Sequence, residues 1–135
     1  MKKIFLLLAI GCSAITANAQ KVMESAVPAG VKTAFIAAHP TAVVSSWTKE
    51  PINNIRAEFI DAGVNTSVLM GPNNNILETV SEIKASDLPK GASASCAGKT
   101  ILKSYKVTAY NGIVTFRVTA DKDYNFDKVG NALVK

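Results

Sequence analysis

Apolar and polar residues alternate with a helical period after Ser25 and with a period of two further along. Apolar positions recur three and four residues apart from Val27 through Phe35 to Ala38, which predicts an amphipathic helix. Pro28 suits the first turn of that helix, and Pro40 ends it near His39. The segment IRAEFI then alternates, with Ile55, Ala57 and Phe59 on one face and Arg56, Glu58 and Ile60 on the other. Turn residues separate four predicted strands: 42–49, 55–61, 64–70 and 76–83.

The same outline begins again 61 residues later. SAVPAG at 25–30 matches SDLPKG at 86–91. In this alignment Leu88, Ala92 and Cys96 correspond to Val27, Val31 and Phe35 of the first helix. Glycine and serine residues weaken this second helix, so we expect it to be short. Cys96 is interpreted as a small buried hydrophobe, with a reactive thiol as the alternative. Four more strands are predicted: 101–109, 113–119, 123–128 and 132–134.

The two halves also end alike. MGPNNNIL at 70–77 matches FDKVGNAL at 126–133, which aligns Asn74 with Gly130, two residue types that tolerate left-handed backbone. We therefore predict an α+β fold of two tandem helix-plus-four-stranded antiparallel sheet repeats, over 27–83 and 84–135, after a short segment at 20–26. The repeats would share one compact domain, with helices on one face of the sheet and the other face open.

The first nineteen residues have the layout of a secretory signal peptide. Two lysines precede an apolar run, IFLLLAI, and ANA at 17–19 predicts cleavage after Ala19. The alternative is a lipoprotein signal, because LAIGC would offer Cys12 for lipidation and a membrane tether. No other segment is long and apolar enough to span a membrane. We therefore expect a periplasmic protein, either free or tethered.

Composition narrows the chemistry. Without Lys2 and Lys3, the 15 basic residues become 13 against 10 acidic ones, an ordinary surface charge that does not predict nucleic-acid binding. Cys96 would be the single cysteine left after removal of the signal, so neither an internal disulfide nor a metal site is expected. We predict no cofactor. DKDYNFD at 121–127 departs from the EF-hand pattern and is interpreted as a hairpin with solvated acids.

Several landmarks resemble the PepSY-like periplasmic proteins, which have a fold similar to the beta-lactamase inhibitor protein. They are the SAVPAGVKTAF start, the HP pair at 39–40, the tryptophan strand, ILETVSEIKASDLP at 76–89 and the closing YNFDKVGNAL. The second helix departs from the alanine- and lysine-rich helix that the family usually has there. The resemblance implies a secreted, non-enzymatic protein, and inhibitors of this fold bind their target through the open sheet.

Function is predicted from the open face and not from a catalytic motif, since the chain has no G-x-S-x-G, H-E-x-x-H or phosphate loop. Our first hypothesis is a module that binds a periplasmic protein or peptide, with candidate contacts Trp47, Arg56, Glu58, Tyr105 and Arg117. Trp47 and Tyr105 would form an aromatic platform or would pack under the helices. The alternatives are an envelope-associated structural protein anchored through Cys12, and a small hydrolase or metal-dependent enzyme in which His39 meets acidic residues from other strands.

Overall fold

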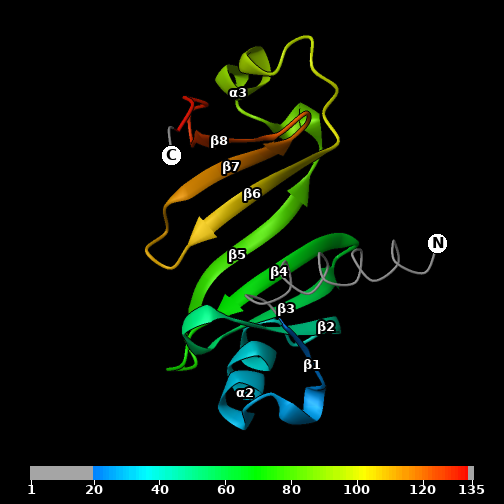
Figure 1. Ribbon diagram of the computed structural model, residues 1–135, viewed down its shortest axis with the longest axis vertical. Helices are drawn as coiled ribbons and strands as arrows, with labels where there is room; N and C mark the ends of the chain where they lie inside the picture. Colours follow the sequence, from blue (N-terminus) through cyan, green and yellow to red (C-terminus); the bar gives the residue numbers. More distant parts are fainter. Residues whose placement is uncertain (1–19, 134–135) are drawn as a thin grey trace, which may run out of the picture.

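The computed structural model describes residues 20–133 (Figure 1). The predicted signal peptide and Cys12 lie outside these residues. Residues 20–133 form two α-helices, α2 (Ala29–Ala38) and α3 (Lys90–Ser95), and eight strands. The strands are β1 (Gln20–Val22), β2 (Val43–Glu50), β3 (Asn54–Asp61), β4 (Val64–Met70), β5 (Ile76–Ile83), β6 (Lys103–Ala109), β7 (Val114–Thr119) and β8 (Asp123–Asp127).

All eight strands belong to one sheet, in the order β1 to β8. Each strand pairs antiparallel with the next one along the chain. Figure 1 shows a single twisted layer, with α2 beside the first strands and α3 at the opposite end, near β8. The predicted α+β class with an open antiparallel sheet is therefore confirmed.

The two helices start in the same way. Pro28 and Pro89 are their N-caps, with φ of −56° and −55° and extended ψ of 139° and 147°, as the non-helical N-cap position requires. The residues just before them, Val27 and Leu88, are buried. In each case a buried apolar side chain directly precedes the proline that begins the helix. The second helix has only six residues, as its glycine and serine content predicts.

Both helices cover the same face of the sheet. Residues that pair directly across neighbouring strands project to the same side. Register carries Phe59 through Thr66, Ser81 and Lys106 to Phe116 and Phe126. Phe59 packs in the first core cluster, with Val31 and Phe35 of α2. Phe126 packs in the second, with Ala92 of α3 and Cys96. Two cores therefore lie on one face, where both α-helices of residues 20–133 pack, and we call the opposite face the open face.

The turns that follow β4 and β8 contact the first turn of a helix in the same manner. Asn74 and Gly130 both have positive φ, of 63° and 98°. A side chain added at Gly30 of α2 would meet the Asn74 amide, and one added at Gly91 of α3 would meet the Gly130 backbone. This local correspondence matches the predicted alignment of Asn74 with Gly130. The division of the whole chain into two repeats stays a prediction.

The sheet differs from prediction at its two edges. The predicted strand 132–134 is reduced to a single bridge between Ala132 and Phe126, so the second half contributes three strands. The eighth strand is instead β1, which pairs with Trp47 to Lys49 of β2. Three residues are too few for an alternating pattern to be recognised. Within residues 20–133, neither helix is long and apolar enough to cross a bilayer.

Candidate functional site

A cavity lies mainly on the open face. It has a volume of about 490 Å³ and extends from β2 to β7. Its lining includes six charged side chains: Arg56, Glu58, Glu78, Glu82, Lys103 and Arg117. We call it the open-face groove. Strand alternation produces this composition, because the apolar partners of these residues project into the cores on the other side.

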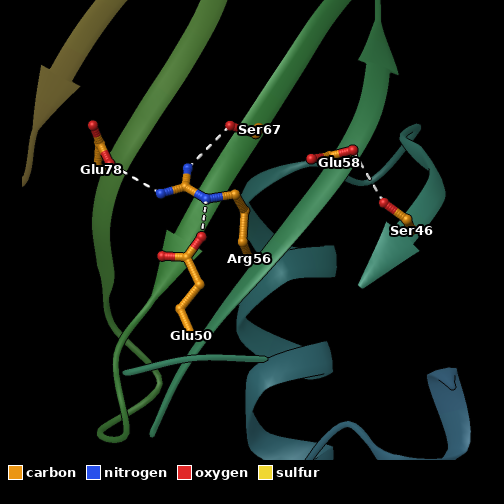
Figure 2. Close-up of polar contacts among 6 residues, drawn as sticks. All are labelled: Ser46, Glu50, Arg56, Glu58, Ser67 and Glu78. Atoms are coloured by element: carbon orange, nitrogen blue, oxygen red, sulfur yellow. Dashed lines mark hydrogen bonds and ion pairs between the residues drawn. The ribbon is translucent and has the colours of Figure 1, made fainter. Parts of the chain in front are cut away.

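Arg56 of β3 ties four strands together within the groove (Figure 2). Its Nε donates to Glu50 Oε1 at 2.5 Å, and its terminal nitrogens donate to Ser67 Oγ at 3.1 Å and Glu78 Oε2 at 3.3 Å. Burial alone would lower the pKa of the guanidinium, but the hydrogen bonds and charges of Glu50 and Glu78 outweigh it and raise the pKa. Arg56 is therefore charged, and its charge is already balanced by the protein's own carboxylates.

Glu82 of β5 forms a second paired group. Its Oε2 accepts hydrogen bonds from Asn65 Nδ2 at 3.1 Å and from Lys103 Nζ at 3.4 Å. The Asn65 amide, and less strongly Lys103, lower the pKa of the Glu82 carboxyl. Lys103 is half exposed, and its ion pair joins β5 to β6 at the surface.

Two charged groups of the groove lack such partners. Glu58 is exposed and accepts one side-chain hydrogen bond, from Ser46 Oγ at 3.1 Å (Figure 2). Arg117 of β7 is half-buried and makes no ion pair or side-chain hydrogen bond within residues 20–133. Register places Arg117 between Tyr105 of β6 and Asn125 of β8. These two side chains are therefore the charged lining residues that form no ion pair within residues 20–133.

The structure brings four of the five predicted contacts into one groove. Arg56, Glu58, Tyr105 and Arg117 all line it. Trp47 does not, because its side chain is 6% exposed in the first core and makes an edge-on contact with Phe35 of α2. The proposed aromatic platform of Trp47 and Tyr105 is therefore corrected, since the two residues project from opposite faces of the sheet. Trp47 adopts the other predicted role, packing under a helix.

The other candidates for chemistry lie away from the groove. His39, half-buried, packs on the rings of Phe35 and Phe59, with Nδ1 3.6 Å from Asp61 Oδ2. Cys96 is 2% exposed in the second core, and burial raises the pKa of its thiol despite the nearby Lys99. Within residues 20–133, no three His, Cys, Asp or Glu side chains gather as metal ligands would.

Sequence reasoning missed the residues that pair the charges of the groove. These are Glu50, Asn65, Ser67, Glu78, Glu82 and Lys103. Most follow the same alternation as Arg56 and Glu58, so the pattern of polar positions on each strand could have indicated them. The sequence does not show which of these side chains pair with each other, because the partners come from different strands and their pairing depends on strand register.

Comparison with known proteins gives structural likenesses without a sequence match: no family model and no curated protein matches the chain. A crystal structure of a Bacteroides eggerthii protein described as periplasmic is similar with a TM-score of 0.74 and 16% identity, over 80% of this chain and 86% of that one. A DUF2874 family protein from Bacteroides uniformis gives 0.73 and 16% over 80% and 87%. A BLIP-like protein from Bacteroides fragilis gives 0.66 and 18% over 79% and 83%. At such identities the likeness shows the fold alone, and that fold is BLIP-like.

Proposed function

We propose that this chain is a secreted periplasmic protein of the PepSY-like type that binds a protein or peptide partner on the open face of its sheet and catalyses no reaction. The observation that carries the proposal is the open-face groove, where Glu58 and Arg117 remain without an opposite charge in residues 20–133. Aromatic and arginine side chains are enriched among residues that dominate binding energy, and Tyr105 lies beside Arg117 by register.

The periplasmic location rests on two supports. The first nineteen residues have the pattern of a secretory signal peptide, with ANA before Gln20. A protein of similar fold is described as periplasmic. Mass spectrometry of the protein purified from the native host tests this part. A chain that begins at Gln20 supports the free form, whereas a lipidated Cys12 supports the envelope-tethered alternative. A chain that keeps Met1 contradicts both.

Affinity capture from an envelope extract of the native host tests the binding role. The bait is the purified mature protein, and the blocking variant is Val80→Arg, which places a long cation on β5 inside the groove. The matched control is Ile36→Arg, at an exposed position of α2 on the helix side. Emission from Trp47, which is buried on the helix side, reports whether each variant is folded.

A true partner is recovered by the wild type and by Ile36→Arg, and is reduced at least about tenfold by folded Val80→Arg, as expected for an interface centre that can no longer close. Equal recovery with both folded variants would contradict binding through the open face. Loss with Ile36→Arg alone would move the site to the helix side.

A further inference from the structure

The charged side chains in and beside the open-face groove divide into residues that form ion pairs with each other and two residues that form none within residues 20–133. Glu50 and Glu78 hold Arg56, and Glu82 holds Lys103. A partner that approached these groups would have to replace contacts that already exist. Glu58 and Arg117 form no ion pair within residues 20–133, so an arriving charge of opposite sign pairs with either of them without competing with an existing ionic partner.

Arg117 is suited to a carboxylate. A guanidinium presents parallel N–H donors that match the two oxygens of a carboxylate. The side chain is half-buried, so an ion pair there is screened less by water than one on a fully exposed surface. The neighbouring Tyr105 offers a ring and a hydroxyl on the same face.

Glu58 is suited to a cation. Its carboxylate accepts one hydrogen bond from Ser46, and a carboxylate has sites for about four. Lysine or arginine of a partner can therefore bind without displacing Ser46. Between the two charges the register passes from Glu58 through the small uncharged side chains of Ser67, Val80 and Val107 to Thr115, two residues before Arg117 on β7.

The separation follows from sheet geometry. Glu58 and Arg117 are four strands apart and offset by two residues, which gives about 20 Å for strands about 4.8 Å apart and a rise of about 3.3 Å per residue. An extended chain covers that distance in about six residues.

We infer, on the basis of the proposed binding role, that the partner lays an extended segment across the strands, with a basic side chain on Glu58, small apolar residues over Val80, and a carboxylate on Arg117. The two charged residues of that segment are about six positions apart. The direction of the segment is set by the charges, because the reverse orientation brings like charges together at both ends.

Selection from a phage-displayed library of random nine-residue peptides tests this inference. The targets are the mature wild type, Arg117→Glu, Glu58→Lys, and the double variant that carries both changes. Lys106→Glu is the matched control, since it makes the same change of charge at an exposed position of β6 on the helix side. Binding of the selected synthetic peptides is then measured by fluorescence anisotropy.

The inference predicts that wild type and Lys106→Glu select peptides with a basic and an acidic residue about six positions apart. Arg117→Glu should weaken these peptides about tenfold or more, the value of a charge-assisted hydrogen bond. The double variant should select the reversed order of charges.

Two outcomes overturn the inference in different ways. Peptides that lose binding to Val80→Arg but show no such charge pattern would refute the partner chemistry and leave the open-face role intact. Selection that yields no binder, or binders that ignore every open-face variant, would refute the inference, and the affinity capture with Val80→Arg then decides separately whether the open face binds a folded partner.

Discussion

Replacing Gly91 by alanine is the most informative test of how α3 is held on the sheet. An ideal Cβ at Gly91 would lie 2.8 Å from the Gly130 carbonyl oxygen and 3.1 Å from its carbon. The Gly130 N–H donates to the Asp127 carbonyl at 3.1 Å and to its carboxylate at 2.9 Å. Backbone fixed in this way cannot move aside. The clash must therefore be relieved by displacement of the helix.

The magnitude follows from two opposing effects. Overpacking a fitted contact costs about 1–3 kcal/mol, and backbone atoms place this case near the upper end. Alanine recovers up to about 1 kcal/mol of helix propensity. The expected result is a loss of about 2 kcal/mol in the free energy of unfolding.

Gly30→Ala is the matched control on α2. An added Cβ there would lie 2.5 Å from Asn74 Nδ2, the end of an exposed side chain that can rotate away. The propensity gain should then leave this variant within about 1 kcal/mol of the wild type, on the stable side.

Urea denaturation, followed by far-ultraviolet circular dichroism and by Trp47 emission, measures both variants. A Gly91→Ala protein as stable as the wild type would refute the packing argument. A loss in Gly30→Ala as large as that in Gly91→Ala would refute the distinction between a movable side chain and a fixed backbone.

Three further predictions concern single side chains. The pKa of the Asp127 carboxyl is lowered, first by the Asn131 side chain and then by backbone N–H groups. The charge of Asp127 therefore stabilises the fold above the ordinary carboxyl pKa of about 4, and this stabilisation is lost as pH falls through the lowered pKa. Asp127→Asn should lower the melting temperature at pH 7 by a margin that shrinks below about pH 4, and a margin that stays constant down to pH 2 would contradict this. Cys96 should react with Ellman's reagent far more slowly than free cysteine until urea unfolds the chain, because its thiol is buried and its pKa raised; rapid native labelling would show an accessible thiol. Ser104 is 2% exposed, and its Oγ has no hydrogen-bond partner in the described chain. Ser104→Ala should therefore leave the free energy of unfolding unchanged or raise it by about 1 kcal/mol. A loss above about 1 kcal/mol in urea denaturation would show that the hydroxyl makes a hydrogen bond.

The sequence predicted the elements of the sheet better than the surface they form. The strands at Val64–Met70 and Ile76–Ile83 have the predicted bounds, because Gly63 and the GPNNN segment separate them clearly. The alternation of IRAEFI is confirmed: Ile55 and Phe59 are buried, and Glu58 is exposed. Local pattern is sufficient for such features, since each depends on neighbours in the chain.

What could not be predicted depends on register. Strand pairing shifts between Val44 and Ser46 and again where Leu69 and Met70 pair with Glu78 and Ile76. Each bulge changes which side chains share a face further along the strand. Trp47 and Tyr105 project from opposite faces of the sheet, and the order of the strands along the chain carries no information on facing. The partners of Arg56 and the lack of an ion pair at Arg117 also depend on the register between strands that are far apart in the sequence.

Photo-crosslinking in the living native host tests the central claim most directly. A photoreactive phenylalanine analogue is placed at Ser67 or Tyr105 of the open-face groove, and at the exposed Ile36 of α2 and Lys99 beyond α3 on the helix side. The account predicts discrete adducts of one partner from the two groove positions and none from the helix-side positions. The same adducts from both faces, or adducts from the helix side alone, would contradict a binding role for the open face.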